Sequence, residues 1–158
     1  MSALPKIRGF MPGDALRLAE IAGEAFADEV QRGMSAFTEE YFTRRGDRPG
    51  VRLVVAEEGD EVAGFMLLTD ATVEAPAQVH LVAVEASHRN RGIGRTLVGY
   101  AVDLLEANSW GKLKLGTRPW NTGMRRVCEA LGFTLEAYLR GEYLGEDLVQ
   151  YGYFPERP

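Results

Sequence analysis

Residues 78–108 read QVHLVAVEASHRNRGIGRTLVGYAVDLLEAN and largely decide the fold. The stretch opens with an apolar, strand-like run from Gln78 to Val84. It closes with a segment from Gly92 to Asn108 whose apolar residues recur at helical spacing. A turn bearing glycines and arginines joins the two. Because the first N–H groups of a helix have no intrahelical acceptor, this turn is suited to hold an anion.

The turn has the features of a pyrophosphate site. Its glycines let the main chain approach a bulky anion, the helix N-terminus contributes about half a positive charge, and arginines add full charges. A dinucleotide-binding turn would need a third glycine where Leu97 stands, and a Walker loop would end in Gly-Lys-Ser/Thr, so both alternatives fail. The candidate site comprises Arg89, Asn90, Arg91, Gly92, Ile93, Gly94, Arg95 and Thr96.

Patterns on either side of this stretch predict the remaining elements. We expect a first strand at Lys6 to Phe10, a helix after Met-Pro-Gly-Asp, a weak second helix from Thr38 to Phe42, and a hairpin of Val51 to Glu57 with Glu61 to Leu68. Further on we expect a strand at Lys112 to Thr117, a helix at Asn121 to Leu131, and a closing hairpin of Phe133 to Leu139 and Tyr143 to Tyr153 that turns at Gly141.

The element order β-α-α-β-β-β-α-β-α-β-β predicts an α/β (α+β) fold with a mixed, mostly antiparallel sheet flanked by helices. A chain of 158 residues without repeats or linkers favours one domain, 1–158. No apolar run approaches a membrane span and the first residues lack a signal peptide, so we expect a cytoplasmic protein that binds no membrane. A net charge of -5 disfavours nucleic acid, and one cysteine with two histidines disfavours a metal site. The sequence leaves open whether the protein forms a homodimer.

These motifs resemble those of the GNAT superfamily of N-acetyltransferases. The family signature Gln/Arg-x-x-Gly-x-Gly/Ala, which binds the coenzyme A pyrophosphate, matches Arg89, Gly92 and Gly94. A second motif, an asparagine leading into a helix that ends in Gly-Phe, matches Asn121 and the Leu131-Gly132-Phe133 run. The resemblance implies that acetyl-CoA is the co-substrate, that Asn121 contributes to its site, and that Val82, Ala83 and Val84 lie on the strand that pairs with the pantetheine arm.

Acetylation of an amine requires a base, an oxyanion donor and a proton for the departing thiolate. The N–H groups of Val82, Ala83 and Val84 are candidate oxyanion donors. His80 is a candidate base, although a hydrogen-bonded strand histidine is an equal interpretation. The glutamate that some family members carry five residues before the motif asparagine is replaced by Gly116, and Glu74 is more readily interpreted as solvated.

The tyrosine that often donates the proton in this family is replaced by Cys128. The Cys128 thiol could donate the proton, but the favoured interpretation is that Cys128 is a small residue of the hydrophobic core. Tyr143 and Tyr151 are alternative donors or packing residues. Asp28 and Glu29 could hold a cationic amine or be solvated. Arg118, Trp120 and Met124 could line the acceptor pocket or only pack.

The resemblance therefore favours an enzyme that transfers an acetyl group from acetyl-CoA to a primary amine by direct attack in a ternary complex. The amine could belong to a small molecule, a protein N-terminus or a lysine. A different class of function is a coenzyme A-binding sensor or regulatory module that does not turn over, because both usual acid and base residues are missing. Positioning and an oxyanion donor can supply much of the rate, which favours the enzyme.

Overall fold

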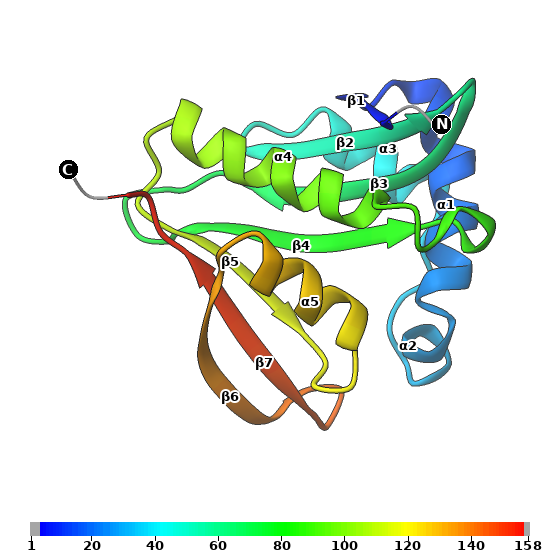
Figure 1. Ribbon diagram of the computed structural model, residues 1–158. Coiled ribbons are helices and arrows are strands. Elements are labelled where there is room, and N and C mark those ends of the chain that lie inside the picture. The colour runs from blue at the N-terminus through cyan, green and yellow to red at the C-terminus, as the bar shows by residue number, and fades with distance from the viewer. Residues whose placement is uncertain (1–3, 157–158) are drawn as a thin grey trace.

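A computed structural model describes residues 4–156 and shows one seven-stranded sheet with helices on both faces (Figure 1). The strands lie in the order β1-β2-β3-β4-β5-β7-β6, and every neighbouring pair is antiparallel except β4 and β5. The predicted mixed, mostly antiparallel fold is confirmed. The strands are β1 (Lys6–Gly9), β2 (Val51–Glu58), β3 (Glu61–Thr69), β4 (Ala77–Val84), β5 (Leu113–Thr117), β6 (Thr134–Tyr143) and β7 (Glu146–Tyr153). The helices are α1 (Ala15–Ala25), α2 (Ala27–Gln31), α3 (Glu39–Gly46), α4 (Ile93–Ala107) and α5 (Thr122–Ala130), with 3-10 turns at Pro12–Asp14 and Ala86–His88.

Side-chain caps mark the starts of α3 and α5, and a glycine marks the start of α4. The Thr38 side chain accepts a hydrogen bond from the Tyr41 N–H at the start of α3, and Asn121 does the same for Met124 at the start of α5. Gly92 precedes α4 with φ of 81°, a left-handed conformation that a side chain would strain. These caps account for the close agreement between the expected and observed helix starts.

The sheet separates two apolar layers. One layer packs α4 and α5 against the sheet around Met66, Leu97 and Leu113, and the other packs α1 and α3 around Leu18, Phe42 and Phe65. Residues alternate between the faces along a strand, so β4 contributes Val82 and Val84 to the first layer and Leu81 and Ala83 to the second. A strand buried on both faces explains the nearly continuous apolar run that the sequence shows there.

Strand β4 leaves its neighbour β5 after three paired residues. The parallel pairing joins residues 77–79 to residues 113–115 and then stops. At the same point the register between β3 and β4 shifts, because Leu67 pairs with Leu81 and Leu68 with Val79, which leaves His80 as the extra residue of a β-bulge. A bulge bends its strand, so the second half of β4 diverges from β5 and the sheet opens between them.

Two expectations about local structure were wrong. The short helix α2 was not foreseen, because it has five residues and none is buried, so no apolar period marks it. The last hairpin turns at Leu144 and Gly145, both with positive φ, rather than at Gly141. Gly141 has φ of 63° inside β6, where the β6–β7 register is irregular. Within residues 4–156 no helix combines the length and apolar character required of a membrane span.

Candidate functional site

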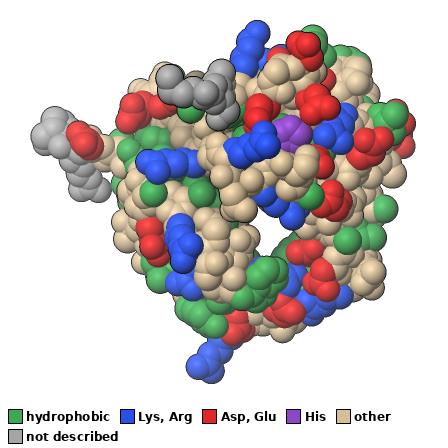
Figure 2. Space-filling model, turned by 45° about the vertical axis from the view of Figure 1, so that its right-hand side comes forward, with side chains coloured by type: hydrophobic (Ala, Val, Ile, Leu, Met, Phe, Trp, Pro, Cys, Tyr) green, Lys and Arg blue, Asp and Glu red, His purple; other side chains and the backbone are tan. Residues whose placement is uncertain are grey.

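The opening between β4 and β5 is a cavity of about 770 Å³. Its walls come from the second half of β4, the loop before α4, the N-terminal half of α5, the end of α1 with α2, and the β6–β7 hairpin. Both Val82, on the α4 face of the sheet, and Leu81, on the α1 face, line it. The cavity therefore penetrates the sheet, and Figure 2 shows it as an opening through the middle of the molecule.

The edge of β4 that faces the cavity carries unpaired backbone groups. The Glu85 N–H donates to the Ala63 carbonyl oxygen at 2.8 Å, and the register places Ala83 opposite Phe65. Since hydrogen-bonding direction alternates along an antiparallel strand, Ala83 bonds to β3, and the N–H groups of Val82 and Val84 point toward the gap. Of the three predicted donors, Val82 and Val84 thus face the cavity through their backbone and Ala83 does not.

The loop before α4 offers a row of free donors beside that edge. Within the described residues, no acceptor pairs with the backbone N–H groups of residues 90–95, and the helix ladder starts with Thr96 N–H to the Gly92 carbonyl at 3.0 Å. A Cβ built on Gly94 would meet only Val84 Cγ2, at 4.0 Å. The helix start is therefore accessible from the cavity, as an anion site requires.

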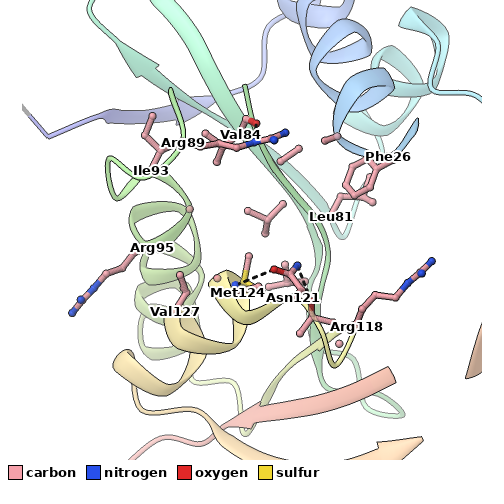
Figure 3. A pocket seen from close by; sticks show the side chains of 18 of the residues that line it. Phe26, Leu81, Val84, Arg89, Ile93, Arg95, Arg118, Asn121, Met124 and Val127 are labelled. Atoms are coloured by element: carbon pink, nitrogen blue, oxygen red, sulfur yellow. Dashed lines mark hydrogen bonds between the residues drawn. The ribbon is translucent and has the colours of Figure 1, made fainter. Parts of the chain in front are cut away.

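Most of the predicted pyrophosphate arginines have protein partners. Arg89 donates through Nε to the Val84 carbonyl at 3.2 Å and lies 3.7 Å from Glu24 Oε1. Arg91 pairs with Glu58 at 2.5 Å and does not line the cavity. Arg95 lines the cavity and forms no ion pair within the described residues, and its guanidinium end extends away from the cavity in Figure 3. The excess positive charge at the loop is therefore smaller than the sequence suggests, and the backbone donors carry more of the anion site.

The loop is also fixed to its surroundings by a histidine. His88 lies between two carboxylates, with Nδ1 2.6 Å from Glu85 Oε2 and Nε2 3.4 Å from Glu61 Oε2. Hydrogen bonds from Ser87 and His88 lower the pKa of Glu85 to about 2. Glu61 and Glu58 both belong to the β2–β3 turn region, so His88 and Arg91 connect the loop to that hairpin. This holds the free N–H groups in place before any ligand arrives.

Two further cofactor candidates use their side chains within the protein. The Thr96 hydroxyl donates to the Gly92 carbonyl at 2.9 Å, and Thr96 does not line the cavity. Asn121 lines the cavity, but its Nδ2 donates to Thr117 Oγ1 at 3.1 Å while its Oδ1 caps α5. Asn121 therefore shapes the wall of the cavity, where β5 ends and α5 begins.

His80 occupies the bulge and lines the cavity. Its Nε2 lies 2.8 Å from the Thr69 hydroxyl oxygen. Desolvation, with a smaller contribution from the positive charge of Lys114, lowers the pKa of His80 below its usual 6.5. The imidazole is therefore neutral at pH 7 and is available as a proton acceptor, though a weaker one than an unperturbed histidine.

The three candidate proton donors have different environments. Tyr143 lines the cavity, and its hydroxyl donates to Met34 Sδ at 3.3 Å. Tyr151 is 1% exposed and accepts a bond from Arg125 Nε at 3.0 Å, away from the cavity. Cys128 is fully buried in the core beside α4, and desolvation raises its pKa to about 12. The structure favours the packing interpretation for Cys128 and Tyr151.

The end of the cavity opposite α4 is charged and aromatic. Glu29 lines it with a side chain only 13% exposed, whereas the Asp28 side chain is 67% exposed and lies outside. Arg118 and Trp120, from the end of β5, line the same wall. Glu74 does not line the cavity. Gly116 does, and a larger side chain at that position would require Leu148 to shift, because a Cβ there would meet Leu148 Cδ2 at 2.8 Å.

Sequence reasoning missed Glu146 and Phe26 at this site. Phe26 lines the cavity, and Glu146 pairs with Arg118 and, at 2.6 Å, with Arg32. The partners of Glu146 are far away along the chain, so no local pattern could reveal the cluster. The apolar spacing of the first helix placed Phe26 on its packed face but not at the margin of a cavity.

Comparisons with known proteins agree with this geometry. The model of the acetyltransferase (GNAT) family matches residues 16–133. A mycothiol acetyltransferase from Streptomyces avermitilis is 36% identical over 121 residues, which cover 73% of this chain and 37% of that protein. The chain thus spans little more than a third of the length of this relative.

Solved structures share the fold along almost the whole chain. An N-acetyltransferase from Staphylococcus aureus Mu50 superposes with a TM-score of 0.84 at 18% identity, covering 96% of this chain and 99% of the other. Another match is a candidate acetyltransferase from Salmonella typhimurium that was solved with its cofactor acetyl-CoA. It has a TM-score of 0.83 at 19% identity, and the match covers 99% of this chain and 96% of the other. The family match spans most of the sequence, including the open strand and the loop before α4. The chain therefore belongs to the acetyltransferase (GNAT) family.

Proposed function

We propose that the protein transfers an acetyl group from acetyl-CoA to a primary amine while both substrates are bound. The observation that supports this most directly is the open edge of β4 inside the cavity. It offers the N–H groups of Val82 and Val84 between the loop of free N–H groups before α4 and the charged end of the cavity around Glu29 and Arg118. Family membership supports the same reaction class.

The coenzyme would enter from the α4 side. Its pyrophosphate would accept hydrogen bonds from the free N–H groups of residues 90–95, where the helix dipole adds favourable charge. Its pantetheine arm, which contains amide groups, would pair with the free backbone groups of β4 as an added strand does. This places the thioester deep in the cavity, close to the point where the strands part.

The reaction would be a direct transfer. The amine nitrogen attacks the thioester carbonyl carbon, a C–N bond forms, and the C–S bond breaks to release the thiolate of coenzyme A. An N–H of Val82 or Val84 would donate to the carbonyl oxygen as negative charge develops there. No cysteine faces the cavity, since Cys128 is buried in the core, which supports attack by the amine without a covalent enzyme intermediate.

Proton transfer would involve His80 and Tyr143. An alkylammonium has a pKa near 10, so its proton must leave before attack. His80 is neutral at pH 7 and could accept that proton through a water molecule, and Glu29 could attract the ammonium form. Desolvation raises the pKa of Tyr143, so its hydroxyl stays protonated and could donate to the thiolate.

A screen of amines with acetyl-CoA tests the proposal, with release of free thiol as the measurement. Acetylation of at least one amine, together with an acetyl-CoA affinity measured by calorimetry, is the expected result. A protein that binds acetyl-CoA but releases no thiol above the rate without enzyme, with any amine class, would instead be a coenzyme A-binding module. That outcome would overturn the proposed reaction while leaving the cofactor site intact.

A further inference from the structure

Arg118 is a buried cation in the wall of the cavity. It follows β5 directly, and its side chain is 6% exposed. Figure 3 shows the side chain extending away from α4 and ending below Phe26, on the side of the cavity opposite the loop that precedes α4. The guanidinium carbon lies 4.9 Å from the centre of the Tyr143 ring and 5.9 Å from that of Trp120. The two rings lie beside the guanidinium. Polar partners must therefore bind along its N–H edges.

One of those edges has no hydrogen-bond partner. Arg118 Nη1 donates to Glu146, but Nε and Nη2 are buried without any acceptor within the described part of the chain. These two atoms form the side of the guanidinium whose parallel N–H groups match both oxygens of a carboxylate. A buried charged donor without a partner is unfavourable, so this edge is suited to a ligand that supplies a planar oxyanion.

A second acidic group, Glu29, lies beside that edge but does not satisfy it. Glu29 Oε1 lies 3.7 Å from Arg118 Nη2, too far for a hydrogen bond. Glu29 belongs to α2, which has no buried residue, so its side chain can adjust without disturbing the core. The cavity wall therefore holds a carboxylate next to a guanidinium edge that has no hydrogen-bond partner and almost no exposed surface, so a ligand reaches this edge when the Glu29 side chain moves.

We propose that the amine acceptor is a zwitterionic amino acid, whose carboxylate binds the Nε and Nη2 edge of Arg118 and whose ammonium group is attracted to Glu29. This rests on the proposed function and specifies its substrate class. Adjacent opposite charges in the wall complement adjacent opposite charges in the ligand. A polyamine or an amide-linked N-terminus would leave the arginine edge unpaired, whereas an amino acid satisfies it. The amine then lies between Arg118 and the open edge of β4, from which the acetyl group is presented.

Matched acceptors give the first test. The standard L-amino acids and their carboxamides share the same side chain and primary amine, but only the acid carries the carboxylate that can form the charged pair with Arg118. A bidentate, charge-assisted contact predicts that kcat/KM for the acid exceeds that for its amide by roughly 10- to 100-fold. Conversion to the amide lowers the pKa of the amine and leaves more of it neutral, so amine reactivity alone would favour the amide. A preference for the acid must then come from binding.

Variants assign the preference to one residue. Arg118→Lys keeps a positive charge for Glu146 but lacks the parallel donors, and we expect the acid-to-amide ratio to fall to near one. Arg32→Lys is the matched control, because Arg32 also pairs with Glu146 yet does not line the cavity, and its ratio should stay at the wild-type value. Glu29→Gln should weaken acid and amide alike, whereas Asp28→Asn, at an exposed neighbour, should change neither.

Binding of the product gives a measurement that does not depend on turnover. An N-acetyl amino acid, titrated calorimetrically in the presence of coenzyme A, should bind the wild-type protein more tightly than its carboxamide and lose this advantage in Arg118→Lys. Equal kcat/KM for acids and amides, or acetylation of other amines but of no amino acid, would overturn the inference and leave the acetyl transfer standing. Absence of thiol release with every amine, combined with no binding of N-acetyl amino acids, would overturn both.

Discussion

Replacement of Gly94 by valine separates the cofactor site from the stability of the fold. A Cβ at this position would project beside the end of β4, with Val84 Cγ2 at 4.0 Å as its nearest protein neighbour. The protein without ligand therefore has room for the first carbon of the new side chain. Because valine is a better helix former than glycine, the free energy of unfolding should stay constant or rise by a few tenths of a kcal/mol.

Binding of acetyl-CoA should respond very differently to the same substitution. The valine methyl groups would occupy the space through which a phosphate approaches the N–H groups at the start of α4. Loss of two charge-assisted hydrogen bonds at about 1.5–3 kcal/mol each predicts a Kd increased by roughly 10²- to 10⁴-fold. Gly94→Ala, with one methyl group, should fall between valine and the wild type.

Calorimetric titration with acetyl-CoA and thermal unfolding measure the two effects. Gly99 is the matched control, since it lies on the same helix, does not line the cavity, and would place an added Cβ 3.9 Å from Leu131 Cδ2. Gly99→Ala should gain up to about 1 kcal/mol of stability and bind acetyl-CoA normally. An unchanged Kd in a folded Gly94→Val protein would refute the placement of the pyrophosphate at this helix.

Three further predictions concern the chemistry. If His80 is the base, kcat/KM should fall as the pH drops through a pKa below 6.5, because protonation removes the proton acceptor. In His80→Ala this acidic limb should disappear and the rate should fall by about 10²- to 10⁴-fold. An identical pH profile in the variant would identify a structural histidine. Val82→Pro removes an N–H donor that faces the cavity and should lower turnover about 10²- to 10³-fold in a folded protein. Ala83→Pro instead removes a hydrogen bond between β3 and β4 and should mainly lower the melting temperature. The reverse pattern would contradict the assigned backbone directions. Cys128→Ser should cost about 1–3 kcal/mol of stability, measured by urea unfolding, and leave kcat unchanged, while a large loss of kcat would return the thiol to the mechanism.

The sequence was sufficient for elements whose signal is local. The apolar period of α4, the capping residues Thr38 and Asn121, and the turn between β2 and β3 each determine structure within a few residues of themselves. The glycine-bearing loop was placed correctly for the same reason. Backbone direction along β4 was not predictable, because it depends on the register with β3 and on the bulge at His80.

The charged parts of the site could not be inferred from sequence spacing. Arg91 pairs with Glu58 from the β2–β3 region, and Arg32 reaches Glu146, more than a hundred residues away along the chain. Such pairs form only after the sheet has assembled. For this reason the loop arginines were expected to be free for phosphate, and the cluster around Arg118 was not foreseen.

The passage of the cavity through the sheet has a consequence for the kinetics of the proposed transfer. A closed pocket with a single mouth would oblige one substrate to bind first and would trap it behind the second. Here the loop before α4 and the Arg118 wall lie toward opposite faces, so two substrates bound as proposed would not obstruct each other's routes (Figures 2 and 3). Initial-rate patterns should therefore fit random addition of the two substrates. Coenzyme A should compete with acetyl-CoA, and the acetylated amine should compete with the free amine.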